Sequence, residues 1–322
     1  MGTSAHWDQT RVLVTGASGF IGRYLVRRLK ELNAQIYATR SPVSRSARRQ
    51  TPDHESTTSS RDACRIPQAL TFDIRDPEAV QNAIHQSRPD IVFHLAAVGT
   101  RNPRVEPMSA LMVNAGGAIN LLEALRETGP DRVVLAGTSY EYGASGATKR
   151  LDPFNTYSAS KVAAWAFGRV YWRAYDLPVV IVRPFQVYGP GQPDQTLIPS
   201  AIRSALAGAD FPMTPGEQRR DFIFAKDVAD GMIAAAETRG IEGKSLDLGT
   251  GIGTTVRRVV ERIWSLTDAR GSIQLGALPY RSSKAMHLIA NAGRTARLTG
   301  WHASTSLDDG LRRTIRSQTL RR

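Results

Sequence analysis

A tyrosine and a lysine stand four residues apart in the segment YSASK, at Tyr157 and Lys161. On a helix, side chains four residues apart lie on the same face. A phenol has a pKa of about 10 and is a weak base at neutral pH, but a neighbouring ammonium and a positively charged oxidised nicotinamide both favour the phenolate. The pair therefore predicts a proton acceptor for alcohol oxidation, which in the reverse direction donates a proton to a ketone.

A hydroxyl group earlier in the chain strengthens this prediction. Thr138 follows an apolar run in the segment AGTSYEYG, and a hydroxyl there can hydrogen-bond the same substrate oxygen as Tyr157. A Tyr–Lys pair alone is more often structural than catalytic. The three residues together favour a catalytic site.

A glycine-rich turn near the N-terminus predicts a cofactor. Gly16, Gly19 and Gly22 follow the apolar run 12–14 and open a segment with apolar residues at helical spacing. The first glycine makes the tight turn, the second lets the backbone approach a pyrophosphate, and the third lets the helix pack close to the sheet. The N–H groups at the helix N-terminus then bind the phosphates. This context favours dinucleotide binding over an ordinary helix start.

Arg40, at the end of the second predicted strand, bears on the choice of dinucleotide. An acidic residue there would bond the ribose 2′-hydroxyl of NAD and repel the 2′-phosphate of NADP, whereas an arginine supplies donors to that phosphate. Ser41 and Arg45 can assist. We therefore expect NADP(H) to be preferred and NAD(H) to remain usable; the alternative is that Arg40 stacks on the adenine or faces solvent. Asp73 is placed to receive the adenine amino group, or else it caps a strand end.

The elements that must position these residues alternate between strand and helix. This alternation predicts an α/β fold, a parallel sheet covered on both faces, with ligands at the carboxyl ends of its strands. The alternation loosens after about residue 185, where we expect a smaller substrate-capping domain. The polar segment 41–64 is predicted to be a loop that closes over the cofactor. Strands are predicted within 12–14, 34–40, 69–76, 90–97, 131–143 and 177–192, and helices within 21–31, 78–89, 109–129 and 157–175.

A single cysteine and scattered arginines limit the classes of function. Cys64 alone allows neither an intrachain disulfide nor a Cys-ligated zinc site, and no histidine shows metal-ligand spacing, so no metal is predicted. The net charge is +13, but the arginines are not gathered into one run, which favours a solvated surface over specific nucleic-acid binding. The apolar runs are short and the N-terminus lacks the apolar core of a secretory signal, so we expect a cytoplasmic enzyme without a membrane span.

Eight motifs taken together resemble the extended short-chain dehydrogenase/reductase family, in its NAD(P)-dependent sugar-nucleotide epimerase/dehydratase group. The resemblance covers about residues 11 to 312. It implies a Rossmann-type doubly wound parallel sheet with a smaller C-terminal substrate-binding domain. The implied boundaries are 1–184, with a returning segment near 221–250, and 185–322. The motifs are TGASGFIG, HLAA, VNAGGAINLLEA, TSYEYG, YSASK, RPFQVYGPGQ, RRDFIFAKDVA and LTGW.

The resemblance also implies residue roles and partners. Thr138, Tyr157 and Lys161 match the catalytic set, and a homodimer is implied through the helices at 109–129 and 157–175. The substrate is a nucleotide-diphosphate sugar, and its implied contacts are Thr138, Ser139, Gln186, Arg220 and Arg281, the two arginines holding the diphosphate. Cofactor contacts are predicted at Gly16, Gly19, Phe20, Ile21, Gly22, Arg40, Asp73, Ile74, Leu95, Ala96, Ala97, Asn114, Tyr157 and Lys161.

Departures from the family pattern shape the functional prediction. Dehydratases carry acidic residues directly after the catalytic Thr, where this chain has Ser139 and Tyr140, so dehydration is disfavoured. Gln186 replaces a usual Asn, Lys284 a usual acid and Asn291 a usual Asp. Arg40 favours a 4-keto-sugar reductase that consumes NADPH, with a sugar-nucleotide 4-epimerase as the alternative. A non-catalytic cofactor-binding scaffold is disfavoured by the intact catalytic set.

Overall fold

The computed structural model describes residues 7–41, 68–100, 105–148, 150–280 and 285–320. The chain divides into two compact units. Unit 1 comprises Met1–Thr138, Asn155–Arg183 and Met232–Leu246, and unit 2 comprises Ser139–Phe154, Pro184–Gly231 and Asp247–Arg322.

This division differs in two ways from the predicted boundaries. The segment that returns to unit 1 is 232–246, which is shorter than the predicted 221–250, and residues 139–154 belong to unit 2 although they precede the sixth strand. The physical reason for the second difference is that this segment packs against a strand of unit 2 that lies far along the chain, near residue 287.

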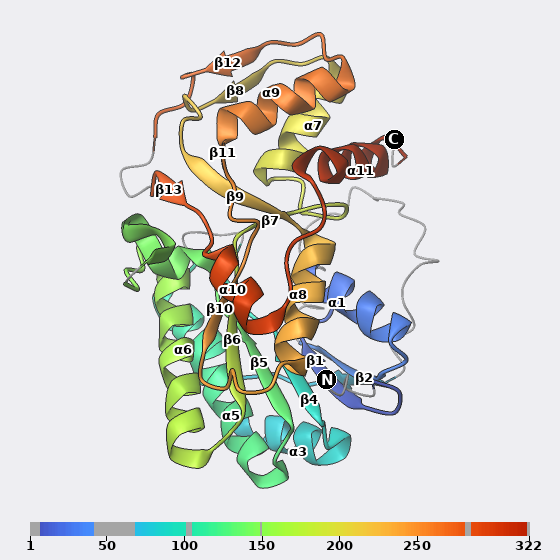
Figure 1. The fold of residues 1–322 in the computed structure, drawn as a ribbon, viewed down its shortest axis with the longest axis vertical. Helices are drawn as coiled ribbons and strands as arrows, with labels where there is room; N and C mark the ends of the chain where they lie inside the picture. Colours follow the sequence, from blue (N-terminus) through green and yellow to red (C-terminus); the bar gives the residue numbers. More distant parts are fainter. Residues whose placement is uncertain (1–6, 42–67, 101–104, 149, 281–284, 321–322) are drawn as a thin grey trace. The chain divides into compact units, whose positions relative to one another are not determined.

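Unit 1 is built on a seven-stranded sheet (Figure 1). The pairs from β6 across to β3 are all parallel, so the predicted doubly wound parallel sheet is confirmed. The register of β1 on β4 sets Thr15 opposite His94, which brings the two strand ends together. In spatial order the strands are β10 (Ser245–Leu248), β6 (Val179–Pro184), β5 (Arg132–Ala136), β4 (Ile91–His94), β1 (Arg11–Thr15), β2 (Gln35–Arg40) and β3 (Gln68–Thr71).

Helices cover both faces of this sheet, as Figure 1 shows. On one face, side chains from alternate positions of the strands, such as Leu13, Val92 and Leu135, pack against α3, α5 and α6 and form a single apolar core. On the other face α1 packs against β1 and β2. The helices are α1 (Phe20–Glu31), α3 (Pro77–Ser87), α5 (Gly117–Thr128) and α6 (Thr156–Tyr175).

The helix predicted at 109–129 is not uniform. It begins as α4 (Pro107–Ala110), continues as a π-helical segment η3 (Leu111–Gly116) and only then becomes α5. Its 22 residues are long and apolar enough to cross a membrane by length and composition, with a mean hydropathy of 1.3 over the best window. Half of that window is buried in the protein, and α5 packs against α3 and α6. We therefore interpret it as a core helix.

The segment 131–143, predicted as a strand that runs into a loop, begins as a strand but continues into a helical segment. β5 ends at Ala136, and residues Ser139–Thr148 form a 3₁₀ segment, η4, in unit 2. Gly143 has a positive φ of 55°, and a Cβ on it would lie 1.7 Å from the carbonyl oxygen of Asp152, so the bend requires glycine.

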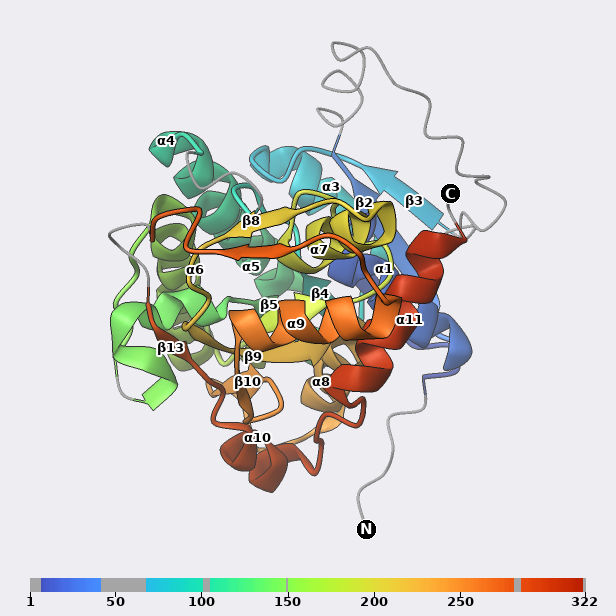
Figure 2. The same ribbon diagram turned by 90° about the horizontal axis from the view of Figure 1, so that it is seen from above.

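Unit 2 has its own sheets and core. β9 is paired by β11, β13 and β7, and β8 pairs with β12; all six strands are labelled in Figure 1. Figure 2 shows β8, β9 and β13 of this set from above. A second apolar cluster joins these strands to α7, α9 and α11, with Tyr188 as its largest fully buried side chain. The elements are β7 (Gln186–Tyr188), α7 (Leu197–Ala207), β8 (Phe211–Met213), β9 (Arg219–Phe224), β11 (Gly253–Thr255), α9 (Val256–Thr267), β12 (Ile273–Leu275), β13 (His287–Leu288), α10 (Ala292–Thr299) and α11 (Leu307–Thr319).

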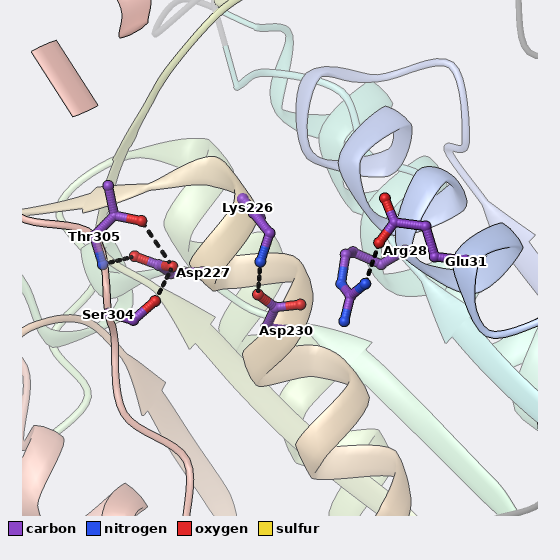
Figure 3. A network of polar contacts seen from close by, with 7 residues as sticks. All are labelled: Arg28, Glu31, Lys226, Asp227, Asp230, Ser304 and Thr305. Carbon is purple, nitrogen blue, oxygen red and sulfur yellow. Dashed lines mark hydrogen bonds and ion pairs between the residues drawn. The ribbon is translucent and has the colours of Figure 1, made fainter. Parts of the chain in front are cut away.

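α8 (Ala225–Glu237) follows β9. Asp227 in its first turn forms hydrogen bonds to Ser304 and Thr305, which precede α11. The buried carboxylate of Asp227 accepts hydrogen bonds from the backbone N–H of Thr305 at 2.9 Å and from the hydroxyls of Thr305 and Ser304 at 3.0 and 3.2 Å (Figure 3). Lys226 pairs with Asp230 one turn on. Figure 3 also shows the ion pair of Arg28 with Glu31 on α1, which belongs to unit 1.

Candidate functional site

The glycine turn has the shape that a bound pyrophosphate needs. Gly16 has a positive φ of 69°, and a Cβ on it would lie 2.7 Å from the backbone of Leu95 and Ala96. A Cβ on Gly22 would lie 2.3 Å from the carbonyl oxygen of Gly16. α1 starts after Gly19 with no side-chain cap and no acidic residue in its first turn, so its first N–H groups and its positive dipole end favour an anion. The residues present therefore fit a dinucleotide.

The loop after β4 is tied to this turn. The Thr15 hydroxyl accepts hydrogen bonds from the backbone N–H groups of Leu95 and Ala96, both at 3.2 Å, and it also contacts Nδ1 of His94 at 2.8 Å. Leu95, Ala96 and Ala97 are half-buried. Hydrogen bonds thus join the end of β1 to the loop after β4, beside the predicted phosphate site.

Two further predicted cofactor residues lie at the ends of β2 and β3. Arg40 is the exposed last residue of β2. Asp73 accepts hydrogen bonds from Nε and the backbone N–H of Arg75, both at 3.0 Å, and this ion pair lowers the pKa of its carboxyl. Ile74 is buried and packs against Gly117, where a Cβ would lie 2.7 Å from its side chain. Arg45 falls within the segment 42–67, outside the described residues, as does most of the predicted loop.

The three residues predicted to be catalytic lie in unit 1. Thr138 is buried two residues after the end of β5, and Lys161 is 3% exposed on α6, one turn after the half-buried Tyr157. A capping box fixes where α6 begins: Oδ1 of Asn155 accepts from the backbone N–H of Ser158 at 2.8 Å, and the Ser158 hydroxyl accepts from the backbone N–H of Asn155 at 3.2 Å. Tyr157 therefore stands in the first turn of a helix whose start is fixed.

Asn114 connects the π-helical segment to this helix. Its Oδ1 accepts from the backbone N–H of Val98 at 2.8 Å, while Nδ2 donates to the Val98 carbonyl at 3.0 Å and to the Ser160 hydroxyl at 2.8 Å. Ser160 in turn donates to the carbonyl of Tyr157 at 2.8 Å. Both amide protons are used and the side chain is fully buried, so Asn114 holds Tyr157 in place; a direct contact with the cofactor stays a prediction.

We expect Asn114→Leu to lower the free energy of unfolding by about 2–4 kcal/mol, because it removes the side-chain partner of the half-buried N–H and C=O of Val98 and of the buried Ser160 hydroxyl. The measurement is urea denaturation. Asn120→Leu is the matched control, since it gives up one bond, to the carbonyl of Ile74 at 3.0 Å, and should cost only about 1 kcal/mol. Equal losses in the two variants would contradict the role assigned to Asn114.

Apart from Thr138, which ends the first segment of unit 1, the predicted substrate residues described by the structure lie in unit 2. Ser139 is buried, and Gln186 is half-buried on β7 opposite Phe222. Tyr140 packs edge-on against Phe154 with ring centroids 5.5 Å apart. Arg281 and Lys284 lie outside the described residues. Asn291 caps α10 through the backbone N–H of Arg294 at 3.2 Å.

Arg220 is a buried cation whose hydrogen-bond partners among the described residues are all carbonyl groups. Its guanidinium donates to the backbone carbonyls of Ala285 at 2.6 Å, Arg219 at 2.9 Å and Met286 at 3.3 Å. Burial lowers its pKa, while the neighbouring Tyr140 acts in the opposite direction. No carboxylate bonds it in the part of the chain that the structure describes, so its charge remains available for an anionic ligand.

Within the described ranges, no three His, Cys, Asp or Glu side chains gather as a metal site would require.

The geometry agrees with what comparison with known proteins finds. The sequence model described as the NAD dependent epimerase/dehydratase family matches residues 12–249. The chain belongs to this epimerase/dehydratase family. It is therefore an enzyme of that family, with a Rossmann-type fold, and the resemblance inferred from the motifs is confirmed.

Individual relatives within the epimerase/dehydratase family differ in reaction. The chain is 26% identical to the UDP-N-acetyl-alpha-D-glucosaminuronate decarboxylase of Bacillus cytotoxicus, over 95% of this chain and 96% of that protein. It is 27% identical to the UDP-glucose 4-epimerase of Mycolicibacterium smegmatis, over 95% and 97%. Among solved structures, MoeE5 in complex with UDP-glucuronic acid and NAD matches with a TM-score of 0.80 and 28% identity, covering 96% of this chain and 98% of that one.

Sequence reasoning missed two polar residues of the site. Ser160 lies inside the YSASK motif but was given no role, although it links Asn114 to Tyr157. Thr15 precedes the first glycine and was treated as part of the turn, although it bonds both Leu95 and His94. A hydroxyl directly before a glycine turn, at the end of an apolar strand, is the signal that could have drawn attention to Thr15.

Proposed function

We propose that this family member moves a hydride between a nicotinamide cofactor and a carbon of a nucleotide-diphosphate sugar, with 4-epimerisation as the favoured reaction. The observation that carries the proposal is the position of Tyr157 one turn before the buried Lys161 on α6, a helix whose first turn is held by Asn155 and Asn114. The family relatives named as epimerases support the choice of reaction.

The roles of the residues follow from their chemistry. The bound nicotinamide would accept a hydride from the sugar carbon and return it. Gly16, Gly19 and Gly22 would hold the pyrophosphate at the N-terminus of α1. Tyr157 would take the proton of the sugar hydroxyl, Lys161 would stabilise the phenolate that results from earlier deprotonation, and Thr138 would orient the same oxygen by a hydrogen bond.

The positive charge of Arg220 in unit 2 would bind the diphosphate of the substrate. The guanidinium of Arg220 donates to three backbone carbonyls in the described part of the chain, and it suits a diphosphate because a planar guanidinium fork can pair with two oxygens. Ser139 and Tyr140 carry no carboxyl group, so the chain lacks the acid–base pair directly after Thr138 that water elimination would use. Dehydration is therefore not the favoured outcome.

Reduction of a 4-keto sugar is the second candidate, and one observation favours it. Arg40 ends β2 and is exposed, which suits the 2′-phosphate of NADP, the usual consumable reductant. Arg40 makes this reaction the one that the sequence favours. The named relatives lend it no specific support, so 4-epimerisation is proposed ahead of it.

One experiment separates these reactions. The enzyme is incubated with a UDP-sugar, and the product is analysed for the 4-epimer without net change of NAD(P)H absorbance; a parallel reaction contains a 4-keto nucleotide sugar and NADPH. Isomerisation without cofactor consumption supports epimerisation, and stoichiometric loss of NADPH supports reduction. Release of CO₂ from a UDP-uronic acid would instead indicate decarboxylation, since oxidation at carbon 4 makes a β-keto acid. Activity in none of these reactions would refute the proposal.

We further propose that NADP(H) is the preferred cofactor. Arg40→Asp is expected to weaken NADP binding at least about tenfold and to strengthen NAD binding, because a charge-assisted bond to the phosphate is replaced by repulsion. Calorimetric titration of both cofactors measures the change. Arg27→Asp, an exposed position on α1, alters the net charge equally and should leave the ratio of the two affinities unchanged.

We also propose that the protein is a homodimer. Five large apolar side chains of unit 1 are exposed on neighbouring helical segments, namely Met108, Leu111, Met112, Phe167 and Val170. The segments that carry them contact one another, and exposed apolar side chains on adjacent helical segments suit a second copy of the chain.

The double substitution Phe167→Glu and Val170→Glu is expected to convert the dimer to a monomer, because it buries two carboxylates in the interface. Light scattering after size-exclusion chromatography measures the mass. Ile252→Glu, an exposed apolar residue of unit 2, is the control that should leave the mass unchanged. A wild-type monomer at micromolar concentration would contradict the proposal.

A further inference from the structure

Thr138 lies on a segment that is attached at both ends to the strands beyond β5 in the sheet. Just before it, the backbone N–H of Gly137 donates to the carbonyl of Val182 on β6 at 2.7 Å. Just after it, the hydroxyl of Tyr142 donates to Oδ1 of Asp247 on β10, also at 2.7 Å. β5, β6 and β10 are successive neighbours in the sheet, so both attachments are to strands of the same sheet.

The ring of Tyr142 has a packing contact that does not involve its hydroxyl. It lies against Phe185 with ring centroids 6.4 Å apart, and the backbone N–H of Phe185 donates to the carbonyl of Leu248 on β10 at 3.0 Å. Tyr142→Phe would leave this packing in place and remove only the hydrogen bond to Asp247. The contribution of that bond can therefore be measured separately from the packing of the ring.

Asp247 is a buried carboxylate whose two oxygens accept from two different donors. The residue is 5% exposed. Oδ1 accepts from the Tyr142 hydroxyl, and Oδ2 accepts from the backbone N–H of Asn291 at 3.1 Å. The hydroxyl of Thr295 holds the backbone of Asp247, since it accepts from its N–H at 3.1 Å and donates to its carbonyl at 2.9 Å. An amide offers only one acceptor oxygen, so a carboxylate is the side chain that serves both donors.

The segment 137–142 carries a group that the proposed reaction needs in a defined position. Thr138 is buried and would orient the reacting oxygen by a hydrogen bond. The rate of such a step depends steeply on placement, and a displacement of about 1 Å can lower it about 100-fold. An attachment that keeps residues 139–142 in one arrangement limits the positions that the Thr138 hydroxyl can take.

We propose that Asp247 is a positioning residue for Thr138. By accepting the hydroxyl of Tyr142, it fixes the far end of the segment 137–142 and with it the direction in which Thr138 presents its hydroxyl. In this role neither Asp247 nor Tyr142 contacts the reacting atoms. The proposal rests on the proposed function in one respect, namely that Thr138 orients the oxygen that exchanges its proton with Tyr157.

The first test measures the attachment without a substrate, by hydrogen exchange of backbone amides detected by mass spectrometry. Tyr142→Phe is expected to speed exchange of the amides of residues 138–143 at least about tenfold, because the segment loses its side-chain bond to β10 and opens more often. Exchange of the β5 amides, 132–136, should stay within about twofold of wild type. Unchanged exchange over 138–143, or an equal rise in β5, would overturn the proposal.

The second test is a double-mutant cycle on kcat with saturating nucleotide sugar. Tyr142→Phe is expected to lower kcat about tenfold and to leave KM within about twofold of wild type, because a displaced Thr138 affects the chemical step. In a Thr138→Val background the same substitution should change kcat by less than about twofold, since no hydroxyl remains to be positioned. A tenfold loss in both backgrounds, or in neither, would refute the role of Asp247.

Substitution of the carboxylate itself provides the matched comparison. Asp247→Ala should lower kcat as Tyr142→Phe does, and the two together should lose at most about twofold more than the larger single effect, because both break the same bond. Asp227→Ala is the control, since this buried carboxylate of unit 2 holds Thr305 and Ser304 instead. It should lower the melting temperature and leave kcat within about twofold. A tenfold loss of kcat in Asp227→Ala would mean that kcat follows the stability of unit 2, against the proposal.

The two measurements can fail separately. If no nucleotide sugar is turned over, the proposed function fails, and hydrogen exchange still decides whether Asp247 holds the segment. If turnover is found and the loss in Tyr142→Phe is the same with and without the Thr138 hydroxyl, the role of Asp247 fails alone.

Discussion

Tyr157→Phe is expected to lower turnover by about 10² to 10⁴-fold, because the variant lacks the proton acceptor that the proposed reaction requires. The aromatic ring is retained, and the capping box that starts α6 involves Asn155 and Ser158 only, so the helix and the bond from Ser160 to the carbonyl of residue 157 should persist. Affinity for the dinucleotide, measured by calorimetry, should therefore stay within about threefold of wild type, since the loss falls on the chemical step.

Tyr175→Phe provides the matched control for this substitution. Tyr175 ends the same helix and is exposed, with the guanidinium of Arg126 3.9 Å from its ring centroid. Its phenol is far along the helix from Lys161, and turnover should be unchanged. Undiminished turnover in Tyr157→Phe would remove Tyr157 from the mechanism, and with it the proposed reaction.

Gly22→Ala is expected to weaken dinucleotide binding by about 100-fold. The added Cβ would lie 2.3 Å from the carbonyl oxygen of Gly16 and 2.9 Å from the backbone of Ala17. Both neighbours are backbone atoms, so the clash is relieved only by moving the turn. Overpacking of this kind costs about 1–3 kcal/mol, and about 2.8 kcal/mol corresponds to a factor of 100 in affinity. Cofactor titration and thermal unfolding with and without NAD(P) measure both effects.

Gly116→Ala is the control, because it replaces a glycine by alanine at a position where the new Cβ meets no close neighbour. Gly116 has a helical φ of −58°, and a Cβ on it would meet its nearest neighbour, the carbonyl oxygen of Leu111, at 3.8 Å. Alanine should be neutral there or should stabilise the helix by up to about 1 kcal/mol. Wild-type affinity in Gly22→Ala would mean that the turn tolerates displacement and that its close packing is not needed for the cofactor.

The features that the sequence predicted best depend on local chain chemistry. The glycine turn is visible because a positive φ at Gly16 and close approach at Gly22 exclude side chains. The start of α6 can be predicted because Asn155 and Ser158 cap it from within four residues. The parallel sheet follows from apolar runs separated by crossover helices, which leave few alternative topologies.

The features that were missed depend on partners that are distant in the chain. The π-helical segment forms where Asn114 bonds Val98 and Ser160, the latter 46 residues away, and no helical periodicity contains that information. Two of the three carbonyl partners of Arg220 come from residues 285 and 286, more than 60 positions later. Similarly, η4 belongs to unit 2 because it packs on β13, so its place could not be inferred from the strand that precedes it.

The interleaving of the two units constrains how this enzyme can be recombined. The chain passes between them at 138/139, 154/155, 183/184, 231/232 and 246/247. A chimaera with a single junction therefore cannot replace the whole of unit 2 by that of a relative while keeping the whole of unit 1. A fragment that stopped at residue 183 would lack β10, which lies beside β6 in the sheet. β6 would then be an unprotected edge strand, whose unpaired N–H and C=O groups can pair with a strand of another chain. New substrate preferences are therefore expected to arise by point substitution within unit 2 rather than by module exchange.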